Sequence, residues 1–379
     1  MIVVLILASA VALVLGVRVL VRMARSARGT PLSRDPAPPP ARAVSAIVPV
    51  LDEEGRVGAA LAALAACGPE LSEILVVDGG SRDATQQVVR EAMRRDPRIR
   101  WIDASPVPPD WNGKAWGIET GLHAASAPWI ATIDADVRVA PRLFAALLAK
   151  REAEDLAALS LATRQELSDP LQGLLHPAFL CTLVYRFGLP GRRARDVAGV
   201  QANGQCFLAR RETLILTDAV RSARDSRCED VTIARALVAS GYGVGFYESE
   251  DAVTVRMYAN GRELWRNWPR SLPMRDRFAS GLAGLAEVIF VQALPLPLAM
   301  GLLWLAPASP FAPAALAVLG GLLLMRLGTL AGMRRAYASP PWTYWLSPLA
   351  DLAVAYALVA SVLRRTHAWR GRTLVAERA

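Results

Sequence analysis

Two long runs without charged residues, one near each end, restrict this chain more than any other feature of its sequence. Residues 1–17 and residues 288–325 contain no Asp, Glu, Lys or Arg. Because an α-helix rises about 1.5 Å per residue, about 20 apolar residues are enough to cross the hydrocarbon core of a bilayer. The first run therefore fits one membrane helix. The second fits two, separated near residues 307–313, where three prolines occur.

Arginines flank the apolar runs, as expected when basic segments stay on the cytoplasmic side. The chain has 43 Lys and Arg against 34 Asp and Glu, a formal net charge of +9. The flanking residues are Arg18, Arg22, Arg25, Arg28, Arg334, Arg335, Arg364 and Arg365. The polar middle of the chain has no stripe of basic and aromatic residues, so we expect a membrane partner and no nucleic acid.

The first apolar run reads as an uncleaved anchor, because its basic cluster follows the run instead of preceding it. The polar middle is then expected in the cytoplasm, in a multi-pass protein of the cell membrane. A last apolar stretch, residues 345–363, is interrupted by Asp351 and fits a span, a re-entrant segment or an interfacial helix. If all four segments crossed, the basic tail would lie outside, against the positive-inside bias, so the number of crossings is left open.

Short apolar runs alternate with helix-like stretches in the polar middle, a pattern typical of an α/β fold with a mostly parallel sheet. Strands are predicted in residues 44–51, 73–77, 98–102 and 129–133, and helices near residues 54–67, 83–95 and 114–126. The expected organisation is an anchor at 1–28, a proline-rich linker at 29–43, a catalytic domain at 44–280, membrane segments at 281–365 and a tail at 366–379. The four cysteines form no C-x-x-C pair and the three histidines are far apart, so neither a zinc site nor a disulfide framework is indicated.

A glycine turn follows the second predicted strand, where Asp78 precedes Gly79 and Gly80. In open α/β sheets, ligands bind beyond the carboxyl ends of the strands, so Asp78 could accept hydrogen bonds from a base or a ribose. The glycines would allow a ligand to approach the backbone. The competing interpretation is an ordinary turn with a helix cap at Ser81 or Asp83.

A pair of aspartates, Asp134 and Asp136, ends the apolar strand WIATI. Alternation along an extended strand would place both carboxylates on the same side. No basic cluster adjoins them in the sequence. Two such carboxylates can hold Mg²⁺ or Mn²⁺ against the diphosphate of a nucleotide-sugar.

A second acidic pair, Glu229 and Asp230, begins a helix predicted to run to Ser240. Sugar transfer to a hydroxyl needs a carboxylate that takes the acceptor's proton, and this pair is the strongest acidic candidate after the metal motif. An acidic pair at a helix start can also serve only as a cap that the helix dipole favours.

Three further polar segments are candidates. Lys114, in Trp111–Lys114, opens a predicted helix and could meet phosphate. The run Gln201–Gln205 precedes a strand, and both segments could also be mere turns. Trp265, Arg266 and Trp268 lie about 20 residues before the second apolar run; they fit either an acceptor site or an amphipathic interface helix.

Taken in order, these segments resemble the family 2 glycosyltransferases of the GT-A fold, over about residues 44–270. The run IVPVLDEE is similar to that family's first strand, VVDGGSRD to its nucleotide-binding turn, DAD to its metal motif, ED to its base motif, and RELWRNW to its arginine–tryptophan motif. The chain departs from the family in having Gly79 where a second aspartate is common, and in the spacing of the arginine–tryptophan motif.

The resemblance implies roles for particular residues. The residues that would contact the donor are Asp52, Glu53, Asp78, Gly80, Lys114 and Asp134, and those that would bind the metal are Asp134 and Asp136. Asp230 would act as the general base, with Glu229 beside it. The acceptor would contact Trp265, Arg266 and Trp268. The reaction would invert the anomeric centre.

The expected function is transfer of a hexose such as glucose, from a donor expected to be a UDP-sugar, to a hydroxylated membrane lipid. Short matches outside the main motifs resemble membrane glycosyltransferases that act on carotenoids or on lipids of the hopanoid pathway. Alternatives are a polyprenyl-phosphate sugar transferase, a polysaccharide synthase and a non-catalytic nucleotide-binding protein.

Overall fold

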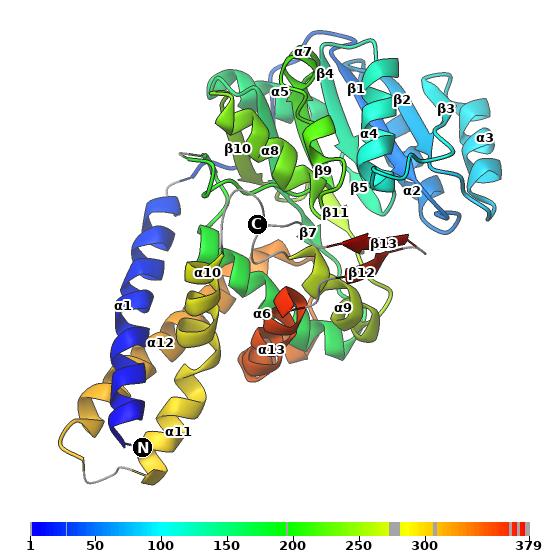
Figure 1. The fold of residues 1–379 in the computed structure, drawn as a ribbon. Coiled ribbons are helices and arrows are strands. Elements are labelled where there is room, and N and C mark those ends of the chain that lie inside the picture. Colours follow the sequence, from blue (N-terminus) through cyan, green and yellow to red (C-terminus); the bar gives the residue numbers. More distant parts are fainter. Residues whose placement is uncertain are drawn as a thin grey trace. The chain divides into compact units, whose positions relative to one another are not determined.

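The computed structural model describes residues 2–27, 29–194, 196–272, 281–305, 309–363, 366–369 and 372–375. It contains two compact units, both drawn in Figure 1. An α/β unit comprises Gly29–Gln165 and Pro190–Met257, and a helical unit comprises Met1–Arg28, Glu166–Leu189 and Tyr258–Ala379. Residues 166–189 and 258–272, which lie within the catalytic domain expected at 44–280, group with the helical unit.

The α/β unit is built on a sheet of eight strands in the order β3-β2-β1-β4-β9-β6-β10-β8. The strands are β1 Val44–Val50, β2 Leu71–Asp78, β3 Ile99–Asp103, β4 Trp129–Ile133, β6 Ala158–Ala162, β8 Arg192–Arg193, β9 Cys206–Arg210 and β10 Val244–Glu248. A smaller sheet contains β5 Val137–Val139, β11 Val253–Val255 and β7 Arg164–Gln165. The four strands predicted from sequence are thus confirmed as β1 to β4.

The prediction of a mostly parallel sheet is confirmed, because six of its eight strands run in one direction and only β9 and β8 run in the other. Strands β3, β2, β1 and β4 run parallel, as do β6 and β10. Strand β9 lies antiparallel between β4 and β6, and β8 lies antiparallel to β10. Apolar runs are the same in parallel and antiparallel strands when both faces are buried, so the sequence pattern did not reveal the direction of β9.

Helices cover both faces of the large sheet. They are α2 Val57–Ala65, α3 Thr85–Arg95, α4 Gly113–Ala124, α5 Leu143–Ala153, α7 Arg211–Leu216, the 3₁₀ helix η1 Arg221–Ala223 and α8 Glu229–Ala239. Along β1, Ala46 and Val48 pack in the core beneath α2 and α5, whereas Ile47 packs in the core beneath α4 and α8. Burial on both faces explains why β1 reads as a continuous apolar run.

Helix α4 lies unusually close to β1. A Cβ atom on Gly121 would be 2.6 Å from Cγ2 of Ile47, so a side chain at Gly121 would force the helix away from the sheet. This close packing holds α4, whose first turn carries Lys114, against β1.

The helical unit consists mainly of apolar helices. They are α1 Ile2–Ser26, α6 Pro170–Phe187, α9 Gly261–Asn267, η2 Trp268–Ser271, α10 Leu282–Glu287, the π-helix η3 Val288–Ala293, α11 Pro295–Leu305, α12 Ala312–Met333, η4 Arg334–Ala336, η5 Trp342–Ala350 and α13 Asp351–Leu363. Strands β12 Thr366–Trp369 and β13 Arg372–Val375 form a short antiparallel pair. The rest of the expected basic tail lies outside the described residues.

Among the described residues, three helical segments are long and apolar enough to cross a membrane: Ile2–Ser26, Ala312–Ala336 and Trp342–Leu363. A fourth candidate is the pair Leu282–Ala293 and Pro295–Leu305, which is bent by 52°. The helical hairpin predicted around the prolines is therefore present, with α11 packed against α12 (Figure 1).

Charged residues in the apolar segments of this unit are paired internally. The Arg326 guanidinium of α12 binds the Asp351 carboxylate at 2.8 and 3.0 Å, and both side chains are buried. Gln292 donates a further hydrogen bond to Asp351 at 2.7 Å. The charge that interrupts the last apolar stretch is therefore neutralised inside the helical unit, as a charge in an apolar medium requires.

Arginine residues of α1 also have internal partners. Arg22 binds both carboxylate oxygens of Glu287 at 2.8 Å, and Arg18 lies 3.2 Å from the same carboxylate. Glu287 is buried at the end of α10. These arginines, predicted only as basic flanks of the first apolar run, therefore also join α1 to α10.

Candidate functional site

Loops that follow three neighbouring parallel strands carry most of the acidic candidates. The loop after β1 contains Asp52 and Glu53, the loop after β2 follows Asp78, and the loop after β4 contains Asp134 and Asp136. Strands β2, β1 and β4 are adjacent and parallel, so their carboxyl ends lie at one edge of the sheet. This is the edge at which α/β sheets bind ligands.

The loops after β1 and β2 are tied together by hydrogen bonds. The Asp52 carboxylate accepts from the Arg82 backbone N–H at 2.8 Å, and the Asp52 N–H donates to the Ser81 hydroxyl at 2.9 Å. The Glu53 N–H donates to the Thr85 hydroxyl at 2.7 Å. Asp52 has a φ of 54°, a left-handed conformation that aspartate tolerates better than most residues. Asp52 therefore shapes this edge in addition to any contact with a donor.

Asp78 is buried and accepts hydrogen bonds from Ser81. The Ser81 backbone N–H lies 3.1 and 3.0 Å from its two carboxylate oxygens, and the Ser81 hydroxyl lies 2.5 Å from one of them. Gly80 has a φ of +100°, which favours glycine at this position. Asp78 therefore makes the contacts expected of an ordinary turn, which was the alternative to nucleoside binding. The same contacts hold the Asp78 carboxylate at the end of β2.

Asp134 and Asp136 lie in a turn, not on an extended strand. Strand β4 ends at Ile133, and the Val137 N–H donates back to the Asp134 carbonyl at 3.2 Å. The alternation argument therefore does not apply, and the turn itself brings the two carboxylates within electrostatic reach of each other. Burial, and next the charge of Asp134, raise the pKa of Asp136 to about 7. One Asp136 carboxylate oxygen is buried without a hydrogen-bond partner among the described residues.

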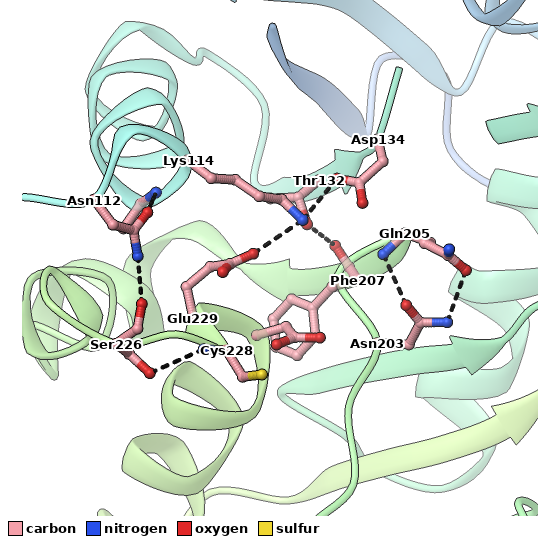
Figure 2. A network of polar contacts seen from close by, with 12 residues as sticks. Asn112, Lys114, Thr132, Asp134, Asn203, Gln205, Phe207, Ser226, Cys228 and Glu229 are labelled. Atoms are coloured by element: carbon pink, nitrogen blue, oxygen red, sulfur yellow. Dashed lines mark hydrogen bonds and ion pairs between the residues drawn. The ribbon is translucent and has the colours of Figure 1, made fainter. Parts of the chain in front are cut away.

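Lys114 joins two acidic motifs. Its ammonium lies 2.7 Å from the Asp134 carboxylate and 2.9 Å from the Glu229 carboxylate, as Figure 2 shows. The exposed fractions of the three side chains are 20% for Lys114, 27% for Asp134 and 9% for Glu229. Burial alone would lower the pKa of Lys114, but the charges of Asp134 and Glu229 outweigh burial and raise that pKa well above its usual value. One cation, Lys114, therefore adjoins the metal motif, although no basic cluster adjoins it in the sequence.

Gly204 makes room for this ion pair. A Cβ atom on Gly204 would lie 2.7 Å from the Lys114 ammonium and 3.3 Å from a Glu229 carboxylate oxygen. The neighbouring Asn203 and Gln205 are held by each other, with the Asn203 amide donating to the Gln205 side-chain oxygen at 3.0 Å. The run Gln201–Gln205, left open as a mere turn, therefore lies at the site.

Glu229 and Asp230 form the first residues of α8, as predicted. The Asp230 carboxylate accepts from the Val231 N–H at 2.9 Å and also from the Gly204 backbone. Burial, and next the charge of Glu229, raise the pKa of Asp230 to about 7. Because Lys114 holds Glu229, Asp230 is the member of the pair left without a cation in direct contact among the described residues.

A small cavity adjoins the acidic pair. It is lined mainly by apolar side chains of α4, β4, β9, α7 and α8, including Ile118, Phe207 and Ile233, and by Glu229 and Asp230. Apolar walls weaken the hydration of a carboxylate, which is the physical cause of the raised pKa of Asp230.

The arginine–tryptophan segment belongs to the helical unit. Trp268 is buried, and its ring centroid lies 4.1 Å from that of His176 and 5.4 Å from that of Phe179. Trp265 is half-buried and lies 6.2 Å from Phe179, whereas Arg266 is exposed. Trp268 thus has a packing role in the helical unit, and Trp265 and Arg266 retain surface available to a ligand.

Within the described residues, no cluster of three or more His, Cys, Asp or Glu side chains has the geometry of a metal site. A divalent ion bound by one or two carboxylates and the phosphates of a substrate does not require such a cluster. The unpartnered oxygen of Asp136 and its acidic neighbour Asp134 fit an ion of that kind.

The acidic loops after β1, β2 and β4 thus lie together at one edge of a mixed α/β sheet. Residues 45–214 match the sequence model of the family described as Glycosyl transferase family 2. The match runs from β1 into α7 and includes Asp52, Asp78, Asp134 and Asp136. This part of the chain is therefore similar to family 2 glycosyl transferases. Glu229 and Asp230 lie beyond the matched residues.

The chain is also similar to solved structures, of which the first below shows the same fold. The mannosyltransferase PcManGT from Pyrobaculum calidifontis, in complex with GDP-Man and Mn²⁺, matches with a TM-score of 0.54 and 19% identity, over 91% of this chain and 99% of that one. TarS 1–349 from S. aureus matches with a TM-score of 0.42 and 12% identity, over 88% of this chain and 96% of that one. No curated protein sequence matches the chain.

Proposed function

We propose that this protein is an inverting, metal-dependent glycosyltransferase that moves a sugar from a nucleotide-sugar to the hydroxyl of a membrane lipid, such as a carotenoid or another terpenoid. The observation that carries the proposal is the placement of Asp134, Lys114, Glu229 and Asp230 around one point at the edge of the sheet. Donor-binding and proton-accepting groups are thereby close enough to act on one sugar. The GDP-Man and Mn²⁺ in the mannosyltransferase complex support the donor class and the divalent ion.

The chemistry follows from the charges of the site. Asp134 and Asp136 would hold a divalent ion, which neutralises the diphosphate as it leaves. Lys114, already between two carboxylates, can contact the same phosphates as a point charge. Asp230 takes the proton of the acceptor hydroxyl as the oxygen attacks the anomeric carbon from the side opposite the diphosphate. Such a direct displacement inverts the anomeric centre.

The lipid acceptor is supported by the helical unit. Helix α9 and η2, which carry Trp265, Arg266 and Trp268, pack against α6 and α13 in the unit that contains the candidate spans found among the described residues. Tryptophan and arginine favour the headgroup level of a bilayer. We therefore propose that Trp265 and Arg266 contact the acceptor near the membrane surface, and that the α/β unit lies in the cytoplasm.

An acceptor assay tests this function directly. Purified protein in nanodiscs is supplied with UDP- or GDP-sugars and with a hydroxycarotenoid, a polyprenyl phosphate or a water-soluble sugar, and mass spectrometry measures which acceptor gains a hexose. We expect the hydroxylated lipid to react fastest. Preference for the polyprenyl phosphate would identify a lipid-phosphate sugar transferase instead, and preference for the soluble sugar would refute the lipid acceptor.

The rate should depend on pH through Asp230. Because its pKa is raised to about 7, Asp230 is protonated below that pH and cannot accept a proton from the acceptor. We expect kcat, measured at saturating donor and metal, to fall about tenfold per unit as pH decreases below 7 and to level off above it. The Asp230→Asn protein should retain a residual kcat that does not fall as pH decreases below 7. If kcat of that variant still falls below pH 7 as in the wild type, the pH dependence arises from another group.

A further inference from the structure

Asn112 is a buried polar residue to which the proposed reaction assigns no role. It precedes α4, and only 5% of its surface is exposed. Its side-chain oxygen accepts a hydrogen bond from the Ala115 N–H at 2.7 Å and so caps the helix. Its side-chain amide donates to the Ser226 carbonyl at 2.6 Å. Both ends of this one side chain are therefore engaged, each with a different segment.

The segment that Asn112 binds leads directly into the acidic pair. The Asn112 backbone N–H also donates to the Arg224 carbonyl, at 2.5 Å. The Ser226 hydroxyl lies 2.7 Å from the hydroxyl of Thr232 in α8 and accepts from the Cys228 N–H at 3.2 Å. The loop at residues 224–228 is thus fixed both to the start of α4 and to the first turns of α8, immediately before Glu229.

These contacts close a ring, which Figure 2 shows. From Asn112 the ring passes through the Ser226 carbonyl to Glu229, from Glu229 to the Lys114 ammonium, and from Lys114 back along α4 to Asn112. Lys114 also binds Asp134, so the ring connects the donor side of the site with the base side. The hydrogen bond from the Asn112 amide to the Ser226 carbonyl is a contact of this ring that involves no charged group.

We propose that Asn112 is a positioning residue for sugar transfer, whose amide hydrogen bond to Ser226 sets the distance between the start of α4 and the loop that carries Glu229 and Asp230. This inference rests on the proposed function. The helix cap made by the Asn112 oxygen places Lys114, whereas the amide places the acidic pair relative to it. Loss of the amide alone should therefore leave donor binding in place and misalign the base with the acceptor, because an error of about 1 Å in a reacting group is enough to slow a reaction by two orders of magnitude.

The experiment separates the two functions of the side chain. In the full-length protein in nanodiscs, Asn112→Asp keeps an oxygen that caps α4 but removes the N–H that Ser226 accepts. We expect kcat to fall by a factor on the order of 10 to 100, with the KM for the donor changed by less than about threefold. Thermal unfolding and donor binding by calorimetry are measured on the same samples.

Asn112→Ser is the second variant, because it introduces no charge, can still cap the helix and cannot reach Ser226. A fall in kcat in either folded variant, with donor affinity preserved, supports the positioning role. An unchanged kcat in a variant that unfolds at the wild-type temperature overturns it. Parallel losses of donor affinity and thermal stability in both variants also overturn it, since they indicate a structural role. If wild-type protein transfers sugar to no acceptor, the proposed function fails instead.

Discussion

The Asp230→Asn protein should bind donor normally and transfer sugar slowly, with kcat reduced by a factor on the order of 10² to 10⁴, the usual contribution of a positioned general base. Asparagine has the shape of aspartate and keeps an oxygen for the Val231 N–H, which lies 2.9 Å from the carboxylate. The start of α8 should therefore persist in the variant. Steady-state kinetics and calorimetric titration with the donor nucleotide provide the two measurements.

Glu229 is the matched control because it precedes Asp230 and carries the same charge. Its carboxylate is held by Lys114 at 2.9 Å, so we expect Glu229→Gln to weaken donor binding through Lys114 more than it slows the chemical step. If Asp230→Asn loses donor affinity while its residual turnover stays normal, then Asp230 is a helix cap and another residue is the base. If Glu229→Gln shows the kinetic loss instead, the two roles are exchanged.

Much of the site could be predicted because its residues follow strands. A buried strand in an α/β sheet leaves an apolar run in the sequence, and polar residues after it must lie at the sheet edge. Asp78 and Asp134 were located in this way, and the structure places them at the ends of β2 and β4. The pair Glu229 and Asp230 was located instead from the start of a predicted helix, which is α8 in the structure. The family match over residues 45–214 independently covers the first two.

Contacts between distant segments could not be predicted in the same way. Lys114 binds carboxylates that lie 20 and 115 residues further along the chain, and no periodic pattern relates those positions. The same holds for Asn112 and Ser226, and for Gly204, whose missing side chain matters only because Lys114 packs against it. The direction of β9 was also hidden, since burial on both faces erases the alternation that would reveal it.

Removal of divalent cations should abolish transfer, and Asp134→Ala should lower kcat/KM by more than about 10²-fold even with metal present, because both changes leave the charge of the diphosphate without its cation. The turn at Asp134 and Asp136 is acidic and partly buried. The pKa of Asp136 is raised first by burial and then by repulsion from the Asp134 carboxylate. Lys114 supplies one positive charge, and it is already shared between Asp134 and Glu229.

The charges of Lys114 and Arg56 already act on the carboxylates of this turn, so a bound diphosphate would need further positive charge. This need is the physical reason to expect an ion bound by Asp134, Asp136 and the donor. Turnover is measured in excess chelator and again after addition of Mn²⁺ or Mg²⁺, and calorimetry follows Mn²⁺ binding to the protein with its nucleotide. Glu91→Ala, an exposed substitution on α3, should behave as wild type in both measurements. Full turnover in excess chelator, or unaltered Mn²⁺ affinity in the Asp134→Ala protein, would refute the assignment and would leave Lys114 as the group that neutralises the leaving diphosphate.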